Sequence, residues 1–159
     1  RISKNKKVLE KKLYVKIFIK NGRIEIIGDE FNEFIASRVI EALEVNFPAE
    51  IALLLKDEEF TLEHLNIKEI SRRTRRSDVR ARVIGREGRT LELIGELSDS
   101  YITLNDNRVS VIGPVDKIET ALHALKALIK GSKQSSVYAY LVKQRKKYHE
   151  DKILFKEKE

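Results

Sequence analysis

Two glycines three residues apart, Gly85 and Gly88, interrupt a stretch that otherwise has the pattern of helices. Glycine has no Cβ, so the backbone at such a loop can come close to a ligand. A helix that begins directly after the loop has unpaired N–H groups and a partial positive charge in its first turn. Arg86 and Arg89 add full charges at the same place. This combination is suited to hold the phosphate groups of a nucleic-acid backbone.

The positive charge of the chain is concentrated around this loop. Residues 72–89, RRTRRSDVRARVIGREGR, contain eight arginines against Asp78 and Glu87, which leaves +6 of a formal net charge of +7. A solvated surface helix usually mixes both signs, and the planar group of arginine fits phosphate oxygens. A charged loop that only keeps the protein soluble is the alternative. A second basic cluster, KQRKK at 143–147, lies near the C-terminus.

The composition excludes several classes of protein. The 159-residue chain has no cysteine, which excludes disulfides and thiolate zinc sites. It has no stretch long and apolar enough to span a membrane. It begins at Arg1 without an initiator Met or a signal-peptide pattern, as a fragment would. These properties favour a cytoplasmic protein with one ordinary domain or two small ones.

No group of residues in the sequence has the spacing of a catalytic or metal centre. His64, His123 and His149 are scattered, with no His-x-x-x-His pair, and His123 is expected to be an ordinary surface or boundary residue. The acidic run at 57–59 is more typical of a turn that caps the short helix before it than of a metal site. We therefore predict no enzyme activity and no cofactor, with a metal-dependent nuclease centred on Asp57 as an alternative.

A repeat shows how the chain is organised. A shift of 85 residues aligns 17–28, IFIKNGRIEIIG, with 102–113, ITLNDNRVSVIG, without a gap. Each segment alternates apolar and polar residues around a tight turn, at Asn21-Gly22 or Asp106-Asn107, and this pattern predicts a β-hairpin. The chain therefore contains two related units, each with a hairpin at its centre.

The second unit contains more elements than the first. Its predicted order is a strand (65–70), a helix (78–84), Gly-x-x-Gly, a helix (89–98), the hairpin (101–113) and a long helix (114–130). The first unit shows only the second half of this order, with helices at 5–13 and 31–43, and the counterpart of Gly88 is Ser3. We predict an α+β protein of two modules side by side, the first incomplete or degenerate.

The order βααββα with the motif Ile84-Gly85-Arg86-Glu87-Gly88 resembles the KH family (type I), whose small modules clamp about four nucleotides at such a loop. The hairpin beside the loop supplies an apolar floor for the bases of single-stranded RNA or DNA. The middle pair of the loop is often doubly basic in KH proteins, and Glu87 departs from this pattern. A KH fold that has lost RNA binding and serves as a protein adaptor is the alternative.

The whole chain resembles the tandem-KH small-subunit ribosome assembly factors of the partner-of-Nob family (Pno/Dim type) of archaea and eukaryotes. Residues 48–67 are similar to its inter-domain segment, and RVIGREGRTLELI (82–94) is close to its glycine loop, which is followed by a basic-Thr pair. Residues 131–147 resemble its Ser-Val-Tyr step and its basic terminal helix. Two features depart from the family pattern. The first unit lacks its N-terminal half, and the tail after Tyr148 has no family counterpart.

The resemblance implies a non-enzymatic factor that binds small-subunit (16S/18S) rRNA near its 3′ end and supports late pre-rRNA maturation. It implies the Nob-family endonuclease and the initiation factor two alpha subunit as partners, and a ribosome-associated location, cytoplasmic or, in a eukaryote, nucleolar. It implies no membrane and no small-molecule substrate. A protein-interaction adaptor with incidental RNA contact is the alternative.

The resemblance places RNA contacts at Gly85, Arg86, Gly88 and Arg89, with Arg82 close by. The predicted RNA-binding set also includes neighbouring residues, which would line a groove beside the loop, and residues of the terminal helix. The full set is Arg80, Arg82, Ile84, Gly85, Arg86, Glu87, Gly88, Arg89, Thr90, Leu91, Ile102, Leu104, Arg145 and Lys146.

The predicted organisation has three parts. Residues 1–59 form the partial first module with a linker helix, 60–131 the KH domain with the glycine loop, and 132–159 a basic C-terminal helix and tail. The spacing of the apolar residues of this helix predicts that it docks on a core through Val137, Tyr138, Leu141 and Val142.

Overall fold

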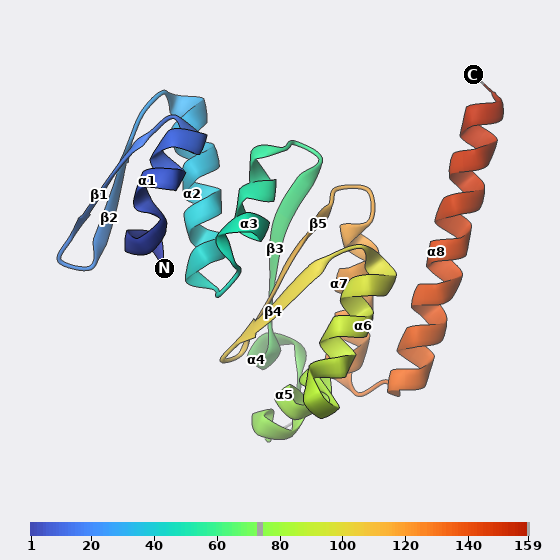
Figure 1. The fold of residues 1–159 in the computed structure, drawn as a ribbon. Coiled ribbons are helices and arrows are strands. Elements are labelled where there is room, and N and C mark those ends of the chain that lie inside the picture. Colours follow the sequence, from blue (N-terminus) through green and yellow to red (C-terminus); the bar gives the residue numbers. More distant parts are fainter. Residues whose placement is uncertain (73–74, 159) are drawn as a thin grey trace. The chain divides into compact units, whose positions relative to one another are not determined.

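The computed structural model of the chain describes residues 1–72 and 75–158. Arg73, which belongs to the predicted basic run, Thr74 and Glu159 lie outside the described residues. The chain divides into two compact units, Arg1–Leu62 and Glu63–Glu159, and the terminal helix α8 belongs to the second of them. Figure 1 shows the elements of both units along the chain.

The first unit contains two long helices and one hairpin (Figure 1). Its elements are α1 (Ile2–Leu13), β1 (Lys16–Lys20), β2 (Arg23–Ile27), α2 (Glu30–Glu44), α3 (Ala49–Ala52) and the 3-10 turn η1 (Leu53–Lys56). The predicted hairpin is confirmed, because β1 and β2 pair antiparallel and Lys20 faces Arg23 across the turn. Asn21 (φ 52°) and Gly22 (φ 75°) both have the left-handed conformation that such a two-residue turn requires. The core of this unit includes the fully buried Leu9 and Ile17.

The second unit is a three-stranded sheet with helices packed on it. Its strands pair in the order β3-β5-β4, and β4 and β5 form the second predicted hairpin. Its elements, including the part of β3 that belongs to the first unit, are β3 (Phe60–Asn66), α4 (Ile67–Ile70), α5 (Arg76–Ile84), the 3-10 turn η2 (Arg86–Gly88), α6 (Arg89–Ser98), β4 (Tyr101–Asn105), β5 (Arg108–Pro114), α7 (Ile118–Lys130) and α8 (Gln134–Glu157).

Two predicted elements in the second unit are misplaced. The strand expected at 65–70 lies at Phe60–Asn66 instead, and residues 67–70 form α4. The strand ends at Asn66 because the Asn66 side chain accepts a hydrogen bond from the Lys68 amide (2.9 Å) and so caps α4. The helix expected from 114 begins four residues later. Pro114 still belongs to β5, and the Lys117 amide donates to its carbonyl (3.0 Å) in a turn that precedes α7.

One hydrophobic core joins the helices of the second unit to its sheet. Side chains of β5 and α7 form most of it, α6 adds Ile94, and α8 adds Val137 and Leu141. The predicted docking of α8 is thus confirmed for these two residues, with Tyr138 packed against the same core. Val142 is 55% exposed, contrary to the prediction, because it follows Leu141 by one position and a helix turns about 100° per residue. Among the described residues, no helix has both the length and the apolar character needed to cross a membrane.

Candidate nucleic-acid interface

The glycine loop, residues 85–88, connects α5 to α6 through three residues with positive φ. Gly85 ends α5 with φ 76° and ψ 176°, and its amide donates to the Ala81 carbonyl (2.9 Å). Glu87 (φ 57°) and Gly88 (φ 76°) then turn the chain into the first residue of α6. A left-handed glutamate costs on the order of 1 kcal/mol, and such local strain is most common at functional sites.

The two glycines of the loop are required for different reasons. A Cβ at Gly85 would meet the Thr90 side chain, with its hydroxyl oxygen at 2.0 Å and its Cβ at 2.6 Å. Gly85 is therefore needed for close packing inside the protein. A Cβ at Gly88 would have no heavy atom within 4 Å. The open side of the loop, where a ligand has room, is at Gly88.

Some amides of the loop are already used inside it. The Gly88 amide donates to the Gly85 carbonyl (3.3 Å), and the Arg89 amide donates to the Arg86 carbonyl. The prediction of unpaired N–H groups at the start of the helix is therefore wrong for the Arg89 amide. The side chains of Arg86, Glu87 and Arg89 are exposed. The charge that the sequence places at this turn thus reaches solvent.

Two arginines of the predicted RNA-binding set have partners within the protein. The Arg82 guanidinium donates to the carbonyls of Gly131 (2.8 Å) and Ser132 (2.7 Å), between α7 and α8. The Arg80 guanidinium donates to the Asn107 side chain (2.9 Å) in the turn of the second hairpin. Arg80 and Arg82 therefore differ from Arg86 and Arg89. The first two have guanidinium groups that are bound within the protein, whereas the side chains of the other two are exposed.

The apolar residues of the predicted set differ in their exposure. Ile84, at the last position of α5, is 37% exposed beside the loop. Leu91, Ile102 and Leu104 are partly buried and pack against the hydrophobic core, so they offer a limited apolar surface. Thr90 is only 3% exposed. The structure therefore places Thr90 beneath the loop and not on its surface.

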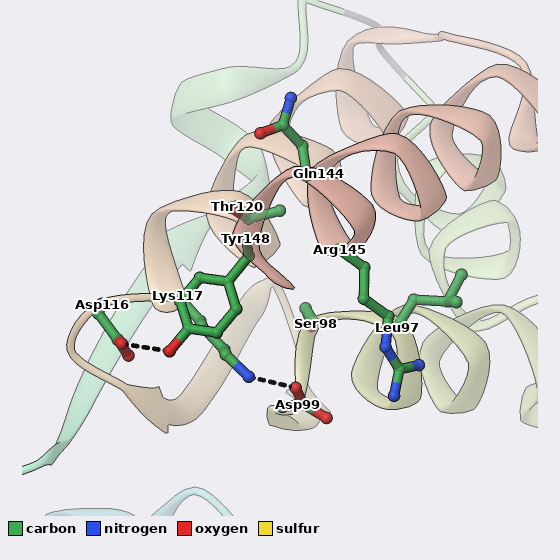
Figure 2. Close-up of a pocket in the computed structure, with 9 residues that line it drawn as sticks. All are labelled: Leu97, Ser98, Asp99, Asp116, Lys117, Thr120, Gln144, Arg145 and Tyr148. Carbon is green, nitrogen blue, oxygen red and sulfur yellow. Dashed lines mark hydrogen bonds and ion pairs between the residues drawn. The ribbon is translucent and has the colours of Figure 1, made fainter. Parts of the chain in front are cut away.

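The basic residues of α8 lie far from the glycine loop. Arg145 is 11 residues along α8 from Gln134, about 16 Å at the rise of an α-helix. Figure 2 shows Arg145 next to Leu97, near the C-terminal end of α6, whereas the loop precedes the N-terminal end of that helix. Lys146 follows it and is exposed. The structure does not bring these two residues together with the loop.

Arg145 borders a small pocket that holds no more than water. Its free volume is about 30 Å³, and its lining residues are Leu97, Ser98, Asp99, Asp116, Lys117, Thr120, Gln144, Arg145 and Tyr148 (Figure 2). A volume of this size accommodates an ordered water molecule and no nucleotide.

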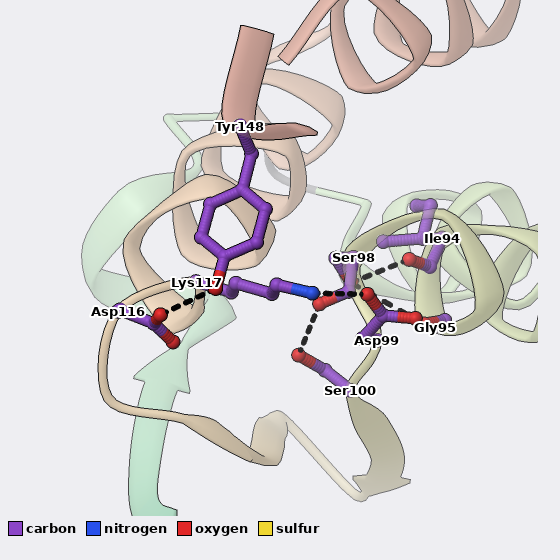
Figure 3. A network of polar contacts seen from close by, with 8 residues as sticks. All are labelled: Ile94, Gly95, Ser98, Asp99, Ser100, Asp116, Lys117 and Tyr148. Atoms are coloured by element: carbon purple, nitrogen blue, oxygen red, sulfur yellow. Dashed lines mark hydrogen bonds and ion pairs between the residues drawn. The ribbon is translucent and has the colours of Figure 1, made fainter. Parts of the chain in front are cut away.

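A polar network beside this pocket holds α8 against the rest of the second unit (Figure 3). The Tyr148 hydroxyl donates to the Asp116 carboxylate (2.6 Å), and Lys117 forms an ion pair with Asp99 (2.6 Å). The Lys117 ammonium also lies 4.2 Å from the centre of the Tyr148 ring, in cation–π contact. These pairings cannot be recognised in the sequence, because Tyr148 and Asp116 are 32 positions apart and no motif connects them.

The remaining titratable candidates lie outside the loop. His123 is exposed, as predicted, and its ring lies 4.7 Å from that of Tyr140. Burial raises the pKa of the Tyr140 hydroxyl. Asp57 accepts a hydrogen bond from the Glu59 amide (2.9 Å), so it stabilises the turn that follows η1. Within residues 1–72 and 75–158, no three histidine or acidic side chains are grouped as metal ligands.

Comparison with known families agrees with this arrangement of elements. The model of the eukaryotic type KH domain (KH-domain type I), in its form for the second KH domain of Pno1, matches residues 61–146. These 86 of 159 residues are more than half of the chain and include the glycine loop. The chain belongs to this family. The predicted resemblance to Pno/Dim-type proteins is thereby confirmed, as is the α+β class with a type I KH fold.

Curated relatives are similar over most of this Pno1-type chain. A KH domain-containing protein of Methanocaldococcus jannaschii is 30% identical over 151 residues, which cover 89% of this chain and 66% of the relative. The RNA-binding protein pno1 of Drosophila melanogaster is 30% identical over 140 residues, which cover 82% of this chain and 58% of that protein. The chain thus spans 58–66% of the length of these relatives.

Solved structures of Dim2p have the same fold as this Pno1-type chain. Dim2p from Pyrococcus horikoshii is 33% identical, with a TM-score of 0.79 over 89% of this chain and 87% of that one. A structure of the a/eIF2alpha-aDim2p-rRNA complex from the same organism matches with 32% identity and a TM-score of 0.83, over 92% of this chain and 85% of that one.

Proposed function

We propose that this chain binds single-stranded RNA of the small ribosomal subunit through its glycine loop and acts as a ribosome assembly factor without enzyme activity. One observation carries the proposal. The turn of residues 86–88 is open at Gly88, lies at the start of α6, and has the exposed cations Arg86 and Arg89 beside it.

The geometry supports different roles for the glycine and the arginines of the loop. A phosphate group over Gly88 would lie at the positive end of α6, where helix N-termini favour anions. Arg86 and Arg89 would add charge-assisted contacts to it. We assign neither Arg80 nor Arg82 to RNA, because their guanidinium groups already bind acceptors within the protein.

The bases would lie toward the apolar side of the loop. Ile84 is the most exposed of the four apolar residues of the predicted RNA-binding set, and we assign it the first contact with a base. Leu91, Ile102 and Leu104 are partly buried, so each would offer only an edge. Arg145 and Lys146 would meet only a strand that continues along α6 toward its C-terminal end.

The choice of RNA rests on the relatives. A solved complex contains a Dim2p that is 32% identical to this chain, together with rRNA and a/eIF2alpha. We extend this to the present chain as binding of small-subunit rRNA near its 3′ end during late maturation. The initiation factor two alpha subunit and the Nob-family endonuclease are the partners that we propose, and the cytoplasmic ribosome is the location.

A salt series tests the RNA-binding proposal. The full chain would be titrated with a fluorescent single-stranded oligonucleotide of the 3′ end of small-subunit rRNA at several salt concentrations. Because phosphate contacts release counterions, the logarithm of the affinity is expected to fall by about 0.7 per phosphate contact for each decade of salt. With two to three contacts the slope would be about −1.4 to −2.1. A slope near zero, or binding no tighter than that of duplex DNA, would contradict the proposal.

The adaptor function remains a second proposal, because the solved Dim2p complex also contains a/eIF2alpha. If it is the main function, a chain with an altered glycine loop keeps its affinity for the initiation factor subunit, and the unaltered chain shows no salt-dependent RNA binding. If RNA binding is the main function, altering the loop lowers RNA affinity. Both affinities can be measured on the same pair of proteins.

A further inference from the structure

We propose that the N-terminal end of α8 positions the glycine loop for phosphate binding, with Gln134 and Tyr138 as positioning residues that act through Thr90. The inference rests on the proposed function of the same loop. It assigns to α8 a role that needs no contact between this part of the helix and RNA.

Thr90 is the point at which the loop meets the protein interior. Its side chain is 3% exposed and fills the space in front of the Gly85 Cα, where an added Cβ would lie 2.0 Å from the Thr90 hydroxyl oxygen. Such a close approach leaves no free volume between the two residues. A shift of the Thr90 hydroxyl toward Gly85 would therefore push Gly85 and the start of the turn, and a shift away would remove the packing that supports them.

Two side chains of α8 fix the position of that hydroxyl. The Gln134 side-chain amide donates to the Thr90 hydroxyl oxygen (3.1 Å), and the Tyr138 hydroxyl donates to the same oxygen (3.2 Å). The two donors are four positions apart and so lie on one face of α8. Thr90 is thus held from two directions by one helix.

The N-terminal end of α8 also contacts Arg82, which lies in α5 before the loop. The Gln134 side-chain amide lies 3.3 Å from the Arg82 carbonyl, in the last turn of α5. In return, the Arg82 guanidinium donates to the carbonyls of Gly131 and Ser132, directly before α8. Hydrogen bonds to charged donors are about twice as strong as neutral ones. The end of α5 and the start of α6 are therefore tied to one short segment.

A second point on α8, at Tyr148, is anchored independently. Tyr148 binds Asp116 and lies against Lys117, three turns beyond Tyr138. Because α8 is held at both places, its N-terminal end cannot slide along α6 without breaking the Tyr148 contacts. The distance between the end of α5 and the start of α6 is thereby constrained, and this distance sets where Gly88 and Arg89 meet a phosphate.

The test uses conservative changes on α8 in the full chain. Tyr138→Phe removes one hydroxyl, and Gln134→Ala removes the other donor. Tyr140→Phe is the matched control, because Tyr140 lies on the same helix but contacts His123 and not the loop. RNA affinity, the salt slope of that affinity, thermal unfolding and amide hydrogen exchange of residues 85–89 are measured for each protein.

We expect Tyr138→Phe with Gln134→Ala to weaken binding of the rRNA oligonucleotide by about tenfold, the effect of one or two lost hydrogen bonds. The salt slope should stay the same, because no phosphate contact is removed. Amide exchange of residues 85–89 should become faster at a temperature where the protein stays folded. Tyr140→Phe should bind within about twofold of the parent, since it removes no contact to the loop.

Substitutions of Thr90 provide a second test of the positioning role, which applies if the double variant does not fold. Thr90→Ser keeps the hydroxyl and should retain most of the affinity, whereas Thr90→Val keeps the shape without the acceptor and should lose it. The positioning role is overturned if the double variant has unchanged amide hydrogen exchange at residues 85–89 and unchanged RNA affinity. If the double variant does not fold, the same result in Thr90→Val overturns it. If Arg86→Asp with Glu87→Asp leaves RNA binding intact, the proposed function is wrong. In that case amide hydrogen exchange of residues 85–89 in the α8 variants still tests the positioning role.

Discussion

Replacement of Gly85 by alanine is expected to destabilise the second unit by about 2–4 kcal/mol and to reduce RNA binding strongly. The conformation of Gly85, with φ 76° and ψ 176°, is essentially restricted to glycine and costs at least about 1 kcal/mol for a residue with a Cβ. The new Cβ would also overlap the Thr90 side chain at 2.0 Å, and such overpacking typically costs about 1–3 kcal/mol. Thr90 cannot yield easily, because two donors of α8 hold its hydroxyl.

Gly88→Ala is the matched control for this prediction. Gly88 has the same φ of 76°, but its added Cβ would have no heavy atom within 4 Å. It should therefore lose only the backbone contribution, about 1 kcal/mol. Urea unfolding followed by NMR signals of the second unit measures both variants. Equal losses for Gly85→Ala and Gly88→Ala would show that Thr90 does not fill the space at Gly85.

Charge reversal in the loop is expected to have the largest effect on RNA binding. Arg86→Asp together with Glu87→Asp should weaken binding of the single-stranded rRNA oligonucleotide by about 30-fold or more, because a carboxylate replaces a cation next to the phosphate. The fold should persist. Both side chains are exposed, and aspartate tolerates the left-handed conformation of residue 87 better than glutamate does. Circular dichroism and fluorescence titration measure the two effects separately.

Arg23→Asp controls for the general effect of net charge. It changes the charge of the chain by the same −2, at an exposed position of β2 in the first unit. We expect it to change RNA affinity by less than about threefold at 0.15 M salt, because it removes no group of the glycine loop and salt weakens the general attraction between exposed charges and RNA. Equal losses for Arg23→Asp and the loop variant would mean that RNA binds through diffuse charge and not through the loop.

The elements that depend on local patterns could be predicted from the sequence. Both hairpins follow from alternation around a two-residue turn, and their turns lie at the predicted positions. The helix at 89–98 has the predicted limits, since it begins after Gly88 and its apolar side is regular. The strand before α4 could not be placed, because the alternation continues past Asn66 while its side chain caps a helix.

The roles of individual polar residues depend on contacts that are distant in sequence. Thr90 meets Gln134 and Tyr138 across 44 and 48 positions, and Arg82 meets Gly131 across 49. From the sequence alone, each arginine of the basic run is an equal candidate for RNA binding. The structure divides them, because Arg80 and Arg82 bind acceptors of the protein while Arg86 and Arg89 are exposed. Only three-dimensional neighbours distinguish these two kinds of arginine.

The most direct test of RNA binding at the glycine loop is a crosslinking map. The full chain would be irradiated with a photoreactive single-stranded rRNA 3′-end oligonucleotide, and the crosslinked peptides would be identified by mass spectrometry. We expect crosslinks within residues 84–91 that are lost in the variant Arg86→Asp with Glu87→Asp. Crosslinks confined to the first unit or to the C-terminal half of α8, with none in residues 84–91, would contradict RNA binding at the loop.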